Sequence, residues 1–133
     1  MTADADIPPW HHSQIRKKRI LLLSGDPRLR EVLTRGLGRH DFEVVPEDGP
    51  RGQVDALLLE VAQGASQQGL SLLRDLRGSG LFAPAIVLAT PSDSGTFAQQ
   101  SGALSAAAVL IKPIDMQELA SELKAAIARA KRP

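Results

Sequence analysis

Polar side chains that could do chemistry stand where apolar runs of the sequence end. Glu60 lies at the end of the run 54–61. Polar and turn residues that follow two other apolar runs are Ser24, Gly25, Asp26, Lys112 and Pro113. If the runs are strands of an open parallel sheet, these residues meet at its carboxyl edge, where such sheets place their sites. A half-buried carboxylate there needs a partner of opposite charge, and Lys112 can supply it.

The run Val54-Asp-Ala-Leu-Leu-Leu-Glu-Val61 determines the expected class of fold. It is short and nearly all apolar, with glycines shortly before and after it, which favours a strand over a helix. A strand that is apolar on both faces belongs to a parallel sheet with helices on either side. The sequence therefore predicts an α/β fold.

Other segments alternate as such a fold requires. Further strands are expected over 20–23, 42–45, 84–90 and 106–111. Helices are expected from Pro27 to Leu37, over 70–77, weakly over 94–104 around Phe97, and from Met116 towards the C-terminus. Asp26 is predicted to cap the first helix, and Asp115 with Glu118 to form a capping box for the last.

The connection at 46–52 is short for this fold. It contains two prolines and two glycines, which predicts a loop. Parallel strands normally need a crossover of about a dozen residues or more. We therefore expect the second helix of the fold to be shortened or missing.

Composition limits the classes of function. The 133 residues are 43% hydrophobic, which suits one globular domain with a real core. A net charge of +1 argues against nucleic-acid and membrane partners. Because cysteine is absent, thiol catalysis and cysteine-based metal sites are excluded. Without a membrane-length apolar segment or a secretory signal, a cytoplasmic protein is expected.

The N-terminal segment is expected to differ from the rest. Residues 1–18 are poor in apolar side chains and predict a disordered lead-in, which leaves a single domain over 19–131. Trp10 is the exception, and we interpret it either as a loosely docked ring or as an anchor for a partner. The pair His11–His12 has no evident third metal ligand, and the basic run 16–19 has no aromatic neighbours; both are interpreted as solvated.

Four stretches resemble the receiver domain of bacterial response regulators. They are Ile20–Arg30, Asp55–Glu60, Pro84–Thr90 and Leu110–Asp115, in the order and spacing of that family. The resemblance covers about residues 19 to 130. It implies a flavodoxin-like fold with sheet order 2-1-3-4-5 and a function in two-component signal transduction.

The same resemblance implies a site whose chemistry is largely lost. Glu60 stands where that family has an aspartate that accepts a phosphoryl group, and Lys112 and Pro113 match the family unchanged. The family's two Mg²⁺-binding acids, its hydroxyl residue and its aromatic switch residue correspond to Ser24 and Gly25, to Ala89 with Thr90 one place later, and to Val109. The resemblance therefore implies a degenerate receiver, or pseudo-receiver.

Chemistry explains why these replacements matter. Mg²⁺ takes near-octahedral oxygen ligands, usually with one or two carboxylates, and it must neutralise the anions of phosphoryl transfer. Gly25 offers no side-chain oxygen, Asp26 lies one place too late, and Glu60 is one methylene longer than aspartate. We therefore predict no productive phosphorylation, no bound metal or other cofactor, and no enzymatic activity.

Two interpretations of Glu60 stay open from the sequence. In the first, Glu60 pairs with Lys112 and serves only the fold. In the second, Glu60 reaches outward as a permanent stand-in for a phosphorylated aspartate. The first is preferred because one carboxylate imitates a metal-bound phosphoryl group poorly.

The predicted function is a phosphorylation-independent interaction module in bacterial signalling or localisation. The expected partner is a protein that contacts the face formed by 93–131, whereas the stripe Met116, Leu119, Leu123 and Ile127 is expected in the core. The sequence leaves the oligomeric state and any output domain open. An alternative is a working phosphoacceptor that uses Glu60 or Asp26 with an unusual metal site. A small-ligand binder ranks lowest because no glycine-rich phosphate loop is present.

Overall fold

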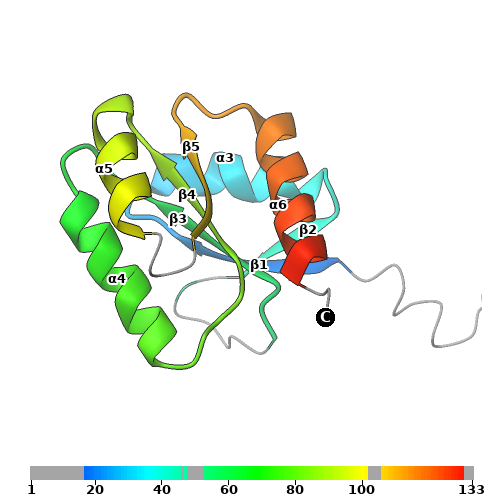
Figure 1. Ribbon diagram of the computed structural model, residues 1–133. Helices are drawn as coiled ribbons and strands as arrows, with labels where there is room; N and C mark the ends of the chain where they lie inside the picture. Colours follow the sequence, from blue (N-terminus) through cyan, green and yellow to red (C-terminus); the bar gives the residue numbers. More distant parts are fainter. Residues whose placement is uncertain (1–16, 46, 48–52, 102–105, 131–133) are drawn as a thin grey trace, which may run out of the picture.

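A parallel sheet forms the centre of the molecule (Figure 1). The computed structural model describes residues 17–45, 47, 53–101 and 106–130. Five parallel strands lie in the order β2-β1-β3-β4-β5. They are β1 (Lys18–Leu23), β2 (Phe42–Val45), β3 (Ala56–Glu60), β4 (Ala85–Ala89) and β5 (Ala106–Ile111). The predicted flavodoxin-like fold and sheet order 2-1-3-4-5 are confirmed.

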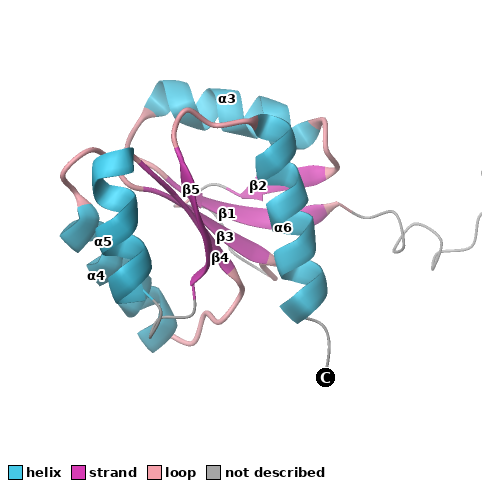
Figure 2. Cartoon of the chain, turned by 45° about the horizontal axis from the view of Figure 1, so that its top comes forward, coloured by secondary structure: helices cyan, strands magenta, loops and turns pink. Residues whose placement is uncertain are grey.

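Helices cover both faces of this sheet (Figure 2). In the described residues they are α3 (Pro27–Gly38), α4 (Ser66–Gly78), α5 (Pro91–Ser101) and α6 (Met116–Ala130). Helices α3 and α6 pack on one face, and α4 and α5 pack on the other. Within the described part of the chain, each helix is too short or too polar to span a bilayer.

The central strands supply side chains to two separate cores. Ile20 and Leu22 of β1 pack with the α3 and α6 side, whereas Leu21 and Leu23 pack with the α4 and α5 side. All four side chains are buried. Because successive strand residues point to opposite faces, burial on both faces removes any apolar–polar alternation from the sequence.

Aspartates begin two of the helices, as the sequence predicts. The carboxylate of Asp26 accepts hydrogen bonds from the backbone N–H of Arg28 at 3.0 Å and of Leu29 at 3.3 Å. The carboxylate of Asp115 accepts from the N–H of Gln117 at 2.9 Å and of Glu118 at 3.1 Å. Each cap satisfies N–H groups that would otherwise lack a partner in the first turn.

Two helices begin earlier than the sequence predicts. Helix α4 begins at Ser66 instead of Leu70, and α5 begins at Pro91 instead of Ser94. At the start of α4, a tertiary contact overrides weak helix propensity, because the Ser66 hydroxyl donates a hydrogen bond to Asp93 at 2.7 Å. Pro91 suits the first turn of a helix, where its missing N–H costs nothing.

Two smaller expectations were also wrong. The helical spacing of Leu29, Val32, Leu33 and Leu37 suggests one buried face, but Val32 is 58% exposed because Leu33 and Leu37 define the buried face of α3. Strand β3 begins at Ala56 instead of Val54. Asp55 instead accepts a hydrogen bond from the backbone N–H of Arg19 at 2.7 Å, so this polar residue ties the start of β3 to β1.

The connection between β2 and β3 comprises residues 46–55. Its described residues, Glu47 and 53–55, are not helical. The predicted lead-in also lies mostly outside the described residues, and Lys18 begins β1. Trp10, His11 and His12 lie outside the described residues.

Candidate functional site

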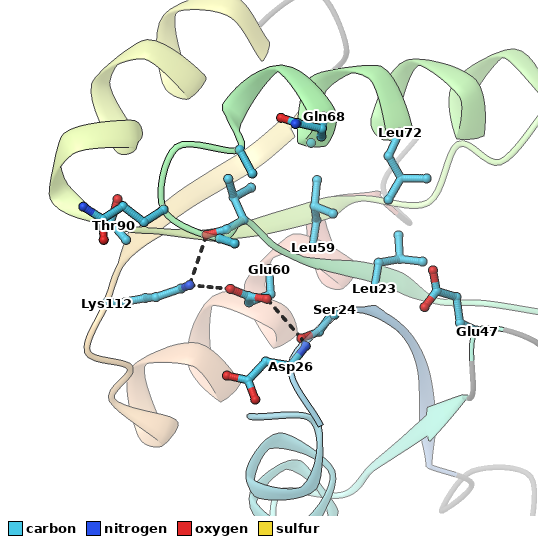
Figure 3. A pocket seen from close by; sticks show the side chains of 16 residues that line it. Leu23, Ser24, Asp26, Glu47, Leu59, Glu60, Gln68, Leu72, Thr90 and Lys112 are labelled. Carbon is cyan, nitrogen blue, oxygen red and sulfur yellow. Dashed lines mark hydrogen bonds and ion pairs between the residues drawn. The ribbon is translucent and has the colours of Figure 1, made fainter. Parts of the chain in front are cut away.

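The polar residues singled out from the sequence meet at the carboxyl edge of the sheet (Figure 3). Ser24 follows β1, Glu60 ends β3, Thr90 follows β4 and Lys112 follows β5. All four line one cavity of about 540 Å³. The parallel direction of the strands produces this convergence, because it brings all their carboxyl ends to one edge.

Glu60 has a protein partner for each of its carboxylate oxygens. Lys112 Nζ forms an ion pair with Oε2, and Ser24 Oγ donates a hydrogen bond to Oε1 at 3.0 Å. Lys112 Nζ also donates to the backbone carbonyl of Val61 at 3.0 Å. The Glu60 side chain is only 5% exposed, so its charge is neutralised inside the protein rather than presented to solvent.

The turn after β1 is committed to starting α3. Ser24 Oγ accepts a hydrogen bond from the backbone N–H of Asp26 at 3.1 Å. Oδ1 of Asp26 is engaged in capping the N-terminus of α3. Gly25 is exposed and has no side chain. Ser24 Oγ is thus bonded to Glu60 and to the Asp26 amide, and Asp26 Oδ1 to the amides of Arg28 and Leu29.

The Thr90 hydroxyl forms its hydrogen bond with Asp93 and not with Glu60. Thr90 Oγ1 donates a hydrogen bond to Asp93 at 2.8 Å. Ala89, the last residue of β4, is fully buried. The Thr90 hydroxyl therefore closes the first turn of α5.

Asp93 is a site residue that the sequence analysis used only as the boundary of a face. Its carboxylate also accepts hydrogen bonds from the backbone N–H of Gly64 at 2.9 Å and from Ser66 Oγ at 2.7 Å. Asp93 thereby joins α5 to the loop before α4. The signal was present, because Thr90 and Asp93 have the spacing of a hydroxyl residue and an acid at a helix start.

The same hydrogen bonds set the protonation of Asp93. The bond from the Gly64 amide contributes most, followed by those from Ser66 and Thr90, and together they lower the pKa of Asp93 below its ordinary value. Burial acts in the opposite direction, and the charge of Lys112 adds a small lowering effect. Asp93 is therefore held as a carboxylate.

The residues of this edge do not fit the Mg²⁺ site that the fold family implies. A Mg²⁺ site of this kind needs one or two carboxylates free to coordinate the ion. Here the Glu60 carboxylate is neutralised by Lys112, the Asp26 carboxylate caps α3, and Gly25 contributes no oxygen. In the described residues, no group of three or more His, Cys, Asp or Glu side chains is placed to hold a metal.

Part of the cavity wall is apolar and belongs to the neighbouring core, and the amides of Gln63 and Gln68 also line it. Leu23, Leu59 and Leu72 line it together with Gly69 of α4. Glu47 lies at its rim and pairs with Arg30 at 3.2 Å, while Arg30 also donates to the Ser24 carbonyl at 2.8 Å. The Glu47 carboxylate is therefore paired as well.

Two further residues of the predicted site are placed by β5 and the turn after it. Val109 is partly buried and packs with the core beneath α4 and α5. Pro113 is exposed and follows a cis peptide bond from Lys112. The stripe on α6 lies in the core, as predicted, with Leu119, Leu123 and Ile127 buried and Met116 packed against them.

Comparisons with solved structures place this fold among receiver domains. The chain superposes on a response regulator receiver domain protein from Clostridium thermocellum with a TM-score of 0.72 and 18% identity, covering 86% of this chain and 97% of that one. A sensor protein from Polaromonas sp. JS666 gives a TM-score of 0.71 and 24% identity over 84% and 97% of the two chains. An adenylate cyclase from Rhodopirellula baltica gives a TM-score of 0.71 and 22% identity, covering 85% of this chain and 89% of that one.

One curated protein also matches most of the chain in sequence. The chain is 31% identical over 119 residues to Protein RcaC of Microchaete diplosiphon, a match that covers 84% of this chain and 18% of RcaC. The chain thus spans less than a fifth of the length of that relative. No family model matches the chain. The protein therefore has the fold of a response-regulator receiver domain, and a shared fold does not by itself establish a shared site chemistry.

Proposed function

We propose that residues 19–131 form a pseudo-receiver, a signalling domain that binds protein partners without being phosphorylated. One observation carries the proposal: both carboxylate oxygens of Glu60 are engaged by Lys112 and Ser24. A carboxylate acting as a nucleophile must approach a phosphoryl donor in line, and small misplacements are costly to such reactions. In this arrangement Glu60 must first break its ion pair while 5% exposed.

The other replaced positions support the same proposal. Signalling by a phosphorylated receiver needs a hydroxyl that follows the phosphoryl group, yet Thr90 is bonded to Asp93. Such signalling also needs a switch residue in β5 that changes position on phosphorylation, and Val109 at that place is packed into the core. The proposed degenerate pocket comprises Glu60, Ser24, Gly25, Asp26, Ala89, Thr90, Lys112 and Pro113, with Val109 at the switch position.

A phosphorylation assay tests the first half of the proposal. The 133-residue chain is incubated with Mg²⁺ and acetyl phosphate and its intact mass is measured. We expect the unmodified mass, whereas a phosphorylated species at Glu60 or Asp26 would establish the alternative of a working phosphoacceptor. A known receiver domain in the same tube confirms that the donor is competent.

The proposed partner surface is formed by α5, β5 and α6, within residues 93–131. Ile111, the last residue of the edge strand β5, is 52% exposed on this surface. Its aliphatic side chain can pack against another protein in a cytoplasmic assembly. We assign it no nucleic-acid or membrane partner, because the chain carries a net charge of only +1.

Matched surface variants test the second half of the proposal. Ile111→Glu places a charge within the proposed surface, and Phe82→Glu makes the same change at another exposed side chain, 75% exposed before β4. Proteins cross-linked to the wild type in cell extract should be lost with Ile111→Glu and retained with Phe82→Glu. Equal loss, or retention by both variants, would reject this surface.

A further inference from the structure

A second hollow lies at the amino edge of the sheet, opposite the Glu60 site. Its lining residues are Lys18, Phe42, Lys124, Ile127 and Ala128, and its volume is about 300 Å³. Lys18 and Phe42 are the first residues of β1 and β2, and the other three belong to the last turns of α6. The hollow is separate from the Glu60 cavity, although its α6 residues fall within the range 93–131 of the proposed partner surface.

The floor of this hollow is apolar and its rim is basic. Phe42 and Ile127 are 2% and 4% exposed and belong to the core beneath α3 and α6. Ala128 adds a methyl group, and Lys18 and Lys124 contribute aliphatic stems with ammonium groups at their ends. An apolar floor between two cations suits an aromatic ring, whose face attracts ammonium groups.

We propose that this hollow is the docking site of the chain's own N-terminal segment, with the Trp10 indole as its anchor. Trp10 is the single tryptophan of the protein, and Ile7, Pro8 and Pro9 precede it. Residues 1–16 lie outside the described part of the structure, and the described chain enters at Lys17, next to a residue that lines the hollow.

Chain length and tethering favour this occupant over an external one. Trp10 precedes Lys18 by eight residues, which span up to about 28 Å when fully extended. The indole can therefore reach a hollow that Lys18 itself lines. A short tether also gives an effective concentration on the order of millimolar, so that even weak packing fills the site.

The charge and the restricted backbone of the N-terminal segment also favour its docking in the hollow. Asp4 and Asp6 are the acidic residues of the segment, and they precede the apolar residues that would enter the hollow. They are complementary to the lysines at its rim, at a modest energy typical of exposed pairs. Pro8 and Pro9 restrict the backbone before binding, which reduces the entropy lost on docking.

Tryptophan fluorescence tests the proposal directly, because Trp10 is the only emitter of its kind. In the 133-residue chain we expect emission shifted to shorter wavelength, and acrylamide quenching reduced several-fold, relative to the same chain unfolded in guanidinium. Ala128→Glu puts a charged side chain into the hollow and should shift emission and quenching to those of an exposed indole. Ala130→Glu makes the same change two residues away, at a position that does not line the hollow, and should leave both unchanged.

A second measurement protects the test against misfolding. Circular dichroism must show the same helix content in the wild type, Ala128→Glu and Ala130→Glu. If the ring is docked, the wild type should show nuclear Overhauser contacts from the indole to the Ile127 methyl groups. An exposed indole in the wild type would overturn the proposal. So would a buried indole that Ala128→Glu leaves unchanged, or a blue shift that disappears on dilution, since the last result would mean that a second copy supplies the ring.

Discussion

The state of a single carboxylate decides how this site is understood. Glu60 is almost completely buried, and Lys112 and Ser24 bond to its two oxygens. A buried ion pair adds little net stability, but removing one partner leaves an uncompensated charge. Glu60 and Lys112 are therefore expected to depend on each other energetically.

A double-mutant cycle measures this dependence. Glu60→Gln, Lys112→Met and the double variant are unfolded in urea, and we expect a coupling free energy of about 1–2 kcal/mol. The control is the exposed pair Glu31–Arg35, whose side chains are 69% and 65% exposed. Its cycle should give about 0.3–0.5 kcal/mol. Equal coupling in the two cycles would mean that Glu60 and Lys112 are not paired in solution.

The hydrogen-bonded Asp93 predicts a pH dependence of stability. An aspartate with a lowered folded-state pKa stabilises the fold above its unfolded pKa, and this contribution disappears as the pH falls through the folded value. The difference in unfolding free energy between wild type and Asp93→Asn should therefore be constant near neutrality and shrink below about pH 5. Urea unfolding across this range measures it.

A graded variant separates this effect from a general loss of stability. Ser66→Ala removes one of the three donors to Asp93 while keeping the carboxylate. Its stability curve should stay closer to that of the wild type and retain a pH dependence. Parallel curves for wild type and Asp93→Asn through acid would contradict the lowered pKa.

At the scale of elements, the stability of α3 shows whether Asp26 acts as a helix cap or as a metal ligand. Asp26→Ala removes two hydrogen bonds to the first turn and should destabilise the protein by about 1 kcal/mol, whereas Asp26→Ser should restore most of the loss. Thermal or urea unfolding gives the values. If Asp26 instead belonged to a cluster of free carboxylates, removing its charge would leave stability unchanged or increased.

The contact between α4 and α5 makes a second prediction for an element. A Cβ at Gly69 would lie 3.0 Å from both the Phe97 ring and Val61, and both neighbours are buried. Gly69→Ala should therefore lose about 1 kcal/mol through overpacking, despite alanine's better helix propensity. At Gly78 of the same helix no atom lies within 4 Å, and Gly78→Ala should gain about 0.5 kcal/mol. A gain at both positions would mean that α4 lies further from the sheet.

The sequence predicted the elements wherever local signals and packing agree. The buried strands were visible as apolar runs, and Asp26 and Asp115 marked their helix starts. The start of α4 was missed because the Ser66 hydroxyl is held by Asp93, which is distant in sequence. Val32 shows the limit of spacing alone, since a stripe of apolar residues does not say where its edge lies.

At the scale of the molecule, the position of the site was predictable and its bonding was not. Parallel strands bring Ser24, Glu60 and Lys112 to one edge, so alternation of elements sufficed to predict their convergence. The roles of Thr90 and Asp93 depend on side-chain directions and on the loop at Gly64. No spacing in the sequence fixes those directions, although the Thr90–Asp93 pattern pointed to a helix start.

Amide NMR of the labelled protein with Mg²⁺, and then with Mg²⁺ and beryllofluoride, tests the pseudo-receiver most directly. A variant that combines Ser24→Asp, Gly25→Asp and Glu60→Asp supplies the missing carboxylates, and position 25 has open space for a side chain. We predict no saturable shifts at Ser24, Glu60 or Lys112 in the wild type, and saturable shifts in the variant. Saturable shifts in the wild type that spread to Val109 and α6 would contradict the account, because the site would then be a working switch.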